Sequence, residues 1–335
     1  MEIEGRLRQK ITDPPRLLVF GPTRILGGFF ILYRHRKGGV MAQYNKPPLT
    51  HAQQVALLES RGLVITNKPK AEQFLSQVNY YRFSAYCLPF EAARHTFQSG
   101  VKFEQIQQLY EFDRRLRFLI DEALEVIEIS FRTALAYYLS RQYGPFVHED
   151  PSKFFVGFDH PSWIDKVHDE IQRSKETFIN HYKSNYDGFP RLPLWMAVEV
   201  MSFGVLSQLY HSLLRADQIA LAKIMGLHST VLVSWLHTFT YVRNICAHHS
   251  RIWNRELAIA MVVPRDRKWI GINAKRVGSV IFAINTFLKG LPLEPDIQKD
   301  WHDEMDQLMS RSINVVNFYH AMGLSEDFQK HDLWK

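Results

Sequence analysis

The feature that most constrains the fold is one long run in which apolar side chains recur every three or four positions. It extends from Phe103 to Ser140, and Tyr143, Gly144 and Pro145 then interrupt it. This period is that of an amphipathic helix with one apolar stripe. Because a stripe of this length must be covered by several other elements, the pattern predicts a helical bundle built around a single long helix.

Shorter helical patterns fill most of the remaining chain. One helix is expected to begin after Thr50, acting as its N-cap, and to end before Gly62. Further helical stretches are expected over residues 69–88, 162–182, 194–213, 230–253, 273–289 and 301–320. Strand patterns are almost absent, and we interpret the apolar segment 257–263 as an irregular connection. The predicted fold class is therefore all-α, a bundle with additional N- and C-terminal helices.

The first forty residues differ from the rest in charge and pattern. They contain Gly and Pro breakers, no helical period, and eight basic residues against three acidic ones. The rest is nearly neutral, so the net charge of +7 does not indicate a general nucleic-acid-binding field. We interpret 1–40 as an irregular basic extension and Met41 as an alternative translation start. An N-terminal helical region (41–100), a helical core (101–260) and a C-terminal helical region (261–335) are expected to follow.

Several classes of protein are excluded by composition. The two cysteines, Cys87 and Cys246, lie far apart, which argues against a disulfide scaffold and a cysteine-built zinc site. The apolar stretch 25–33 is too short to span a bilayer, and it has no signal-peptide cleavage pattern. We predict a cytoplasmic protein that has no membrane partner, no metal and no cofactor.

The segment with the most chemistry is YVRNICAHH, residues 241–249. On a helix Asn244 and His248 lie four apart on one face, and Arg243 lies about 100° away from Asn244. Such a guanidinium and imidazole would line one groove. An Arg-x4-His spacing is expected about once by chance in this chain, so the context carries the weight. The plain alternative is a buried polar network that fixes helix packing.

An arginine beside a histidine suits RNA cleavage without a metal. The imidazole can transfer a proton near neutral pH, and the guanidinium can stabilise the charge on a phosphorane. Attack by the 2′-hydroxyl would leave a 2′,3′-cyclic phosphate and a 5′-hydroxyl, and DNA would resist cleavage.

Five ordered stretches resemble the abortive-infection Abi-like family (AbiD/AbiF type), a branch of the HEPN superfamily. They are KPPLTHAQQVALLESRGL (46–63), LSQVNYYRFSAYCLPF (75–90), YEFDRRLRFLIDEALEVIEISFRTALAYYLS (110–140), LPLWMAVEVMSFGVLSQLY (192–210) and YVRNICAHHSRIWNREL (241–257). Together they span about 46–260, whereas 1–45 has no recognised counterpart.

The resemblance implies both a fold and an activity. The core 101–260 would be HEPN-like, and the protein would be a metal-independent endoribonuclease toxin in bacterial defence against phage. Arg243 with His248, or His249, would be the catalytic pair, with Asn244 alongside and Glu128 orienting Arg243. The active site would form at a homodimer interface. A small structured noncoding RNA would bind and restrain the enzyme.

Candidate RNA contacts lie elsewhere on the chain. Arg132 forms an i,i+4 pair with Glu128, and Glu199 lies in an apolar helical stretch where a carboxylate is expected to have a partner. A basic patch combines cations with one aromatic residue: Arg265, Arg267, Lys268, Trp269, Lys275 and Arg276. The alternatives are a plain surface ion pair and a solvated loop. The alternative function is a non-catalytic RNA-binding defence protein that senses or scaffolds a structured RNA.

Overall fold

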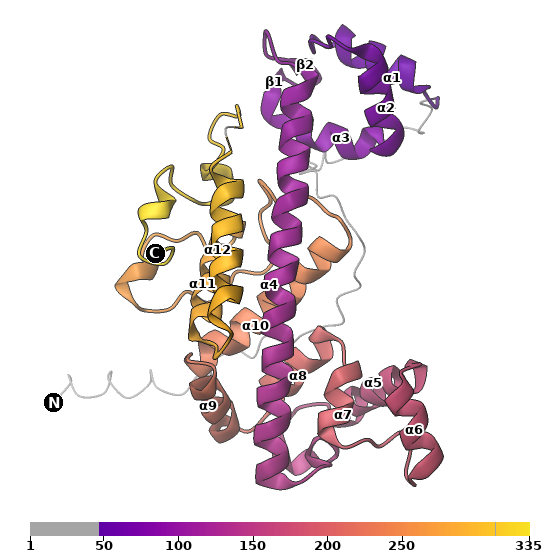
Figure 1. The fold of residues 1–335 in the computed structure, drawn as a ribbon, viewed down its shortest axis with the longest axis vertical. Coiled ribbons are helices and arrows are strands. Elements are labelled where there is room, and N and C mark those ends of the chain that lie inside the picture. Colours follow the sequence, from indigo (N-terminus) through magenta and orange to yellow (C-terminus); the bar gives the residue numbers. More distant parts are fainter. Residues whose placement is uncertain (1–46, 312) are drawn as a thin grey trace, which may run out of the picture. The chain divides into compact units, whose positions relative to one another are not determined.

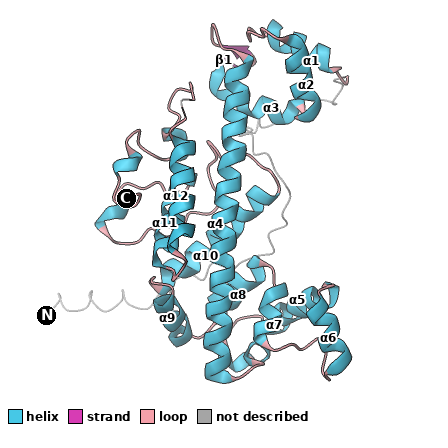
Figure 2. Ribbon diagram, viewed as in Figure 1, coloured by secondary structure: helices cyan, strands magenta, loops and turns pink. Residues whose placement is uncertain are grey.

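The structure is a computed structural model that describes residues 47–311 and 313–335, so the predicted extension 1–40 lies outside the described residues. Residues Leu49–Lys335 form one unit. Helices dominate it, which confirms the all-α prediction (Figure 2). The strands in the described part of the chain are a small antiparallel hairpin, β1 (Glu91–Ala93) and β2 (Thr96–Phe97), which the sequence pattern did not predict.

The long predicted helix is α4, Phe103–Tyr143, and it ends at Gly144 with a positive φ of 94°. Its apolar stripe is buried along its whole length, from Phe103 to Leu139. The stripe packs against α3, α7, α8, α9, α10, α11 and α12, so one helix organises most of the unit (Figure 1). This is the arrangement that an apolar face of such length requires.

The helices before α4 begin at polar caps. α1 (His51–Ser60) starts at Thr50, whose side chain forms a capping box with Gln53. The expected stretch 69–88 is instead two helices, α2 (Lys68–Gln77) and α3 (Tyr80–Cys87). The division falls at Asn79, whose side chain accepts the Tyr81 N–H at 2.8 Å and so starts a new helix.

The middle of the chain divides in the same way. The expected helix 162–182 is α5 (His160–Arg173) and α6 (Thr177–Asn185), and 194–213 is α7 (Leu194–Val200) and α8 (Phe203–Ser212). Ser202 causes the second break because its side chain caps the N-terminus of α8. An additional helix, α9 (Arg215–Ile224), was not predicted.

The last three helices are shorter than expected. α10 is Ser229–Ala247, α11 is Val277–Gly290 and α12 is Pro295–Met309. The predictions that α10 continues to 253 and that a helix continues to 320 are therefore wrong. The segment 257–263 is irregular, as predicted. Single 3-10 turns occur at Leu88–Phe90, Val147–Glu149, Pro151–Lys153, Arg267–Trp269, His320–Met322 and Phe328–Lys330.

Both cysteines are free and buried, and burial raises the pKa of each thiol. Cys246 therefore packs as a small apolar side chain. Among the described residues, crossing a bilayer would take α9 and α10 together, bent by 77° between them, since neither these nor any other single helix is long and apolar enough.

Candidate active site

The candidate residues lie where α10 ends. Arg243 is in its last turns with the side chain 31% exposed, and His248 is the C-cap. His249 follows with a positive φ of 54°, and the Ser250 N–H bonds back to the Ile245 carbonyl at 3.0 Å. This is the Schellman termination of a helix, here with histidine at the position that glycine usually takes. It corrects the expectation that His248 lies within the helix.

Solvent can reach the guanidinium of Arg243 and the imidazoles of His248 and His249. His248 and His249 are both exposed, while Arg243 and Asn244 are half-buried. The Asn244 carbonyl accepts the His248 N–H at 3.0 Å, which fixes His248 one turn beyond it. One guanidinium and two imidazoles are therefore presented together at one end of α10. The alternative of a sealed polar network does not fit this exposure.

Glu128 on α4 faces Arg243. Its Oε2 lies 3.9 Å from Arg243 Nη2, and its Oε1 accepts a hydrogen bond from Arg132. Glu128 and Arg132 are both nearly buried, so their pair is not the plain surface ion pair of the alternative. The expected contact between Glu128 and Arg243 is confirmed.

Arg132 caps the C-terminal end of α7. It donates to the Val198 carbonyl and, at 2.7 Å, to the Met201 carbonyl. These oxygens lie at the C-terminus of a helix, where carbonyls lack intrahelical partners and a cation is favourable. Since the guanidinium is occupied by protein oxygens, the RNA contact expected of Arg132 does not fit its position.

Asp121 is a site residue that the sequence analysis missed. It lies seven residues before Glu128, on the same face of α4. Burial raises the pKa of its carboxyl group, and the positive charges of Arg243 and His249 oppose that rise. Arg243 and His249 therefore act on the same carboxylate. The seven-residue spacing from Glu128 was the signal that could have revealed it.

Asp113 anchors the segment that follows the two histidines. It is fully buried, and its Oδ1 accepts the N–H groups of Ile252 at 3.0 Å and Trp253 at 2.7 Å. Its Oδ2 accepts the Tyr86 hydroxyl at 2.5 Å and the Arg117 guanidinium. A carboxylate and an arginine four residues apart within an apolar stripe were the overlooked sequence signal.

Helix α3 holds the same segment from the other side. Arg82 donates to the His249 carbonyl, and Arg251 donates to the Ala85 carbonyl at 2.5 Å. Burial lowers the pKa of the Arg251 guanidinium. The backbone that carries the two imidazoles is thus fixed to α3 at one end and to α4 at the other.

The predicted basic patch is only partly available to a ligand. Trp269 is 4% exposed and packs on Trp235 with ring centroids 5.4 Å apart, so the base-stacking role expected of it does not fit. Lys275 pairs with Glu256 at 3.3 Å, and Arg276 bonds to Asn254. The other cations of the patch, Arg265, Arg267 and Lys268, are exposed.

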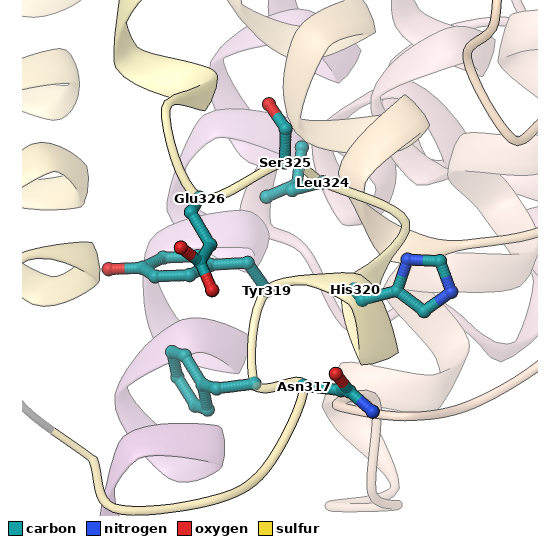
Figure 3. A pocket seen from close by; sticks show the side chains of 7 residues that line it. Asn317, Tyr319, His320, Leu324, Ser325 and Glu326 are labelled. Atoms are coloured by element: carbon teal, nitrogen blue, oxygen red, sulfur yellow. The ribbon is translucent and has the colours of Figure 1, made fainter.

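A hollow of about 230 Å³ lies in the C-terminal segment, lined by residues within 317–326. Figure 3 shows the Tyr319 and Glu326 side chains on one side of its turn and the His320 ring pointing the opposite way. The His320 imidazole and the Glu326 carboxylate therefore do not converge in this hollow, as the two groups of a proton-transfer pair would. Across residues 47–311 and 313–335, no three His, Cys, Asp or Glu side chains are grouped to hold a metal ion.

The comparison with protein families bears on the same residues. The stretch 73–254 matches the model of a family described as Abi-like protein, which is more than half of the 335 residues. The chain belongs to the Abi-like family. The matched range contains Asp113, Asp121, Glu128, Arg243 and His248. The family connects this Abi-like protein with abortive infection, a bacterial defence against phage. No curated protein and no solved structure matches the chain.

Proposed function

We propose that this Abi-like protein is a metal-independent endoribonuclease of the HEPN type, acting as the toxin of a phage-defence system. The observation that carries the proposal is the end of α10. There Arg243 and two exposed imidazoles are presented to solvent beside the carboxylates of α4. An arginine that pairs with a carboxylate keeps a defined orientation, and its remaining N–H donors stay free to bind a phosphate.

The proposed reaction needs one base, one acid and one cation. An imidazole takes the proton of the 2′-hydroxyl, whose oxygen attacks the neighbouring phosphorus, and the bond from phosphorus to the 5′-oxygen breaks. The 5′-oxygen receives a proton and leaves as a hydroxyl, while the other product ends in a 2′,3′-cyclic phosphate. Arg243 stabilises the additional negative charge on the phosphorane.

Two adjacent residues compete for the proton-transfer role. The resemblance allows either His248 or His249 in it, and the electrostatic interaction with Asp121 favours His249. The resemblance implies an active site at a homodimer interface, where a second copy of the chain would bring its own copy of this segment. We therefore propose a cytoplasmic homodimer, restrained by a structured RNA, with RNA as its substrate.

The test compares single variants in growth arrest and in cleavage of purified RNA with EDTA present. Arg243→Ala is expected to abolish both, and one of His248→Ala and His249→Ala is expected to do the same. Arg114→Ala and His181→Ala are matched controls, because both side chains are exposed and lie outside the candidate site. All variants are checked for folding by circular dichroism.

Two results would overturn the proposal. Cleavage that survives in Arg243→Ala and in the double variant of His248 and His249 would remove the site from the chemistry. Tight, salt-sensitive RNA binding without cleavage by the wild-type protein would favour the non-catalytic RNA-binding alternative instead.

A further inference from the structure

An open hollow of about 480 Å³ lies between α4 and α7. Helix α4 contributes Tyr137 and Arg141, and α7 contributes Trp195 and Glu199. Tyr137 is 66% exposed and Trp195 is 51% exposed. Glu199, which the sequence predicted to be a buried carboxylate with a partner, is exposed, so that prediction is wrong. Two large aromatic faces, one cation and one carboxylate therefore border the same space.

One arginine contacts residues of both the hollow and the site at the end of α10. Arg132 links the two, because it pairs with Glu128 on one side and donates to the Val198 carbonyl on the other. Glu128 faces Arg243, while Val198 lines the hollow. Tyr137 lies nine residues beyond Glu128 on α4, which is about 13 Å along the helix axis and, because nine residues make about two and a half turns, on the opposite face of the helix. A single strand that reached both would pass around α4, with several nucleotides between the two points.

The chemistry of the walls points to a base rather than a phosphate. Exposed aromatic faces bind unpaired bases by stacking, and a nearby arginine adds a cation for the backbone. The Arg141 guanidinium already lies 5.5 Å from the centre of the Tyr137 ring. The Glu199 carboxylate would repel a phosphate but would accept a hydrogen bond from an exocyclic amine, as carboxylates accept from cytosine N4.

We propose that this hollow binds one unpaired, amine-bearing base of single-stranded RNA, cytosine in the first instance, on the same strand as the phosphate held by Arg243. The proposal rests on the proposed function, since it places the base along the same RNA strand. Charge complementarity favours this occupant, because Arg141 would face the sugar-phosphate backbone of the RNA and Glu199 would face the exocyclic amine of the base. Trp195 and Tyr137 supply the stacking surface.

The experiment measures binding rather than cleavage. Fluorescence anisotropy with 2′-O-methyl single-stranded oligonucleotides, either C-containing or with U in place of C, reports affinity without turnover. Trp195→Ala and Tyr137→Ala are expected to weaken binding by about 5- to 160-fold, the range for loss of one stacked base. Glu199→Gln is expected to reduce the preference for C over U. Phe118→Ala is the matched control, because Phe118 is exposed on α4 and pairs with Arg114 at the same 5.5 Å, outside the hollow.

Failure of this inference and failure of the proposed function give different results. If Arg243→Ala loses cleavage while Trp195→Ala and Tyr137→Ala bind like Phe118→Ala, the hollow does not bind RNA and the nuclease proposal stands. If the hollow variants lose binding but the wild-type protein cuts nothing, the base site stands and the nuclease proposal fails. If they change the sedimentation mass and leave RNA affinity intact, the hollow is a contact between copies and the inference is overturned.

Discussion

Replacing Asp113 by asparagine tests whether this buried carboxylate fixes the segment that carries the two histidines. The side chain is fully buried and accepts four hydrogen bonds, two from backbone and two from Tyr86 and Arg117. Asparagine keeps the shape and one oxygen, which can still accept from Ile252 and Trp253. Its amide nitrogen cannot accept from Arg117, so a buried guanidinium loses its counter-charge.

The expected cost follows from that unpaired charge. Breaking one side of a buried ion pair destabilises a protein by about 3–5 kcal/mol, a large share of a typical stability of about 5–15 kcal/mol. Removing both charges avoids the unpaired ion. The double variant Asp113→Asn with Arg117→Met is therefore expected to lose less stability than the two single variants added together.

The assay is equilibrium urea unfolding followed by tryptophan fluorescence, combined with hydrogen exchange at the Ile252 and Trp253 amides. Asp113→Asn should lower the free energy of unfolding and increase exchange at both amides. Asp165→Asn, an exposed site on α5, should stay within about 0.5 kcal/mol of wild type. The reasoning is refuted if Asp113→Asn costs less than about 1 kcal/mol and both amides keep their protection.

Three further outcomes follow from burial and packing. Burial raises the pKa of Asp121, so ionisation disfavours the folded state; Asp121→Asn should raise the urea midpoint at pH 7, and this gain should vanish as the pH falls below the carboxyl pKa. Burial lowers the pKa of His148 from 6.5 to about 3, so its neutral form stabilises the fold above pH 6.5 and this contribution is lost as the pH falls toward 3. His148→Gln should therefore give a shallower decline in unfolding free energy over that interval, and equal slopes would contradict the assignment. Gly278→Ala should destabilise by about 1–3 kcal/mol in urea unfolding, because its Cβ would lie 2.7 Å from Leu324 and 2.8 Å from the Met322 carbonyl. An unchanged midpoint would show that the 322–324 turn can move.

The sequence predicted the elements whose apolar period is long and unbroken. α4 was expected over 103–140 and spans Phe103–Tyr143, because its stripe alone determines that it is a helix. The breaks at Asn79 and Ser202 were missed because single polar caps there interrupt patterns that otherwise continue. The end of α10 was missed because a histidine, not a glycine, takes the left-handed position.

The candidate site was predictable only where its residues are neighbours in sequence. Arg243, Asn244 and the two histidines form one motif, and Glu128 was reached through the family resemblance. Asp113 and Asp121 depend on how α4 meets the segment after α10, which local pattern does not specify. Trp269 was predicted to stack a base from a basic loop, yet its indole packs on Trp235 because burial of apolar area is favourable.

The central claim is most directly tested by the ends of the RNA fragments produced in EDTA. The purified protein is incubated with a single-stranded RNA and with the same strand carrying 2′-O-methyl groups, and the fragments are analysed by mass spectrometry. The account predicts 2′,3′-cyclic phosphates and 5′-hydroxyls from the RNA, with the methylated strand intact. Cleavage of the methylated strand, or 5′-phosphate ends that disappear with EDTA, would contradict it.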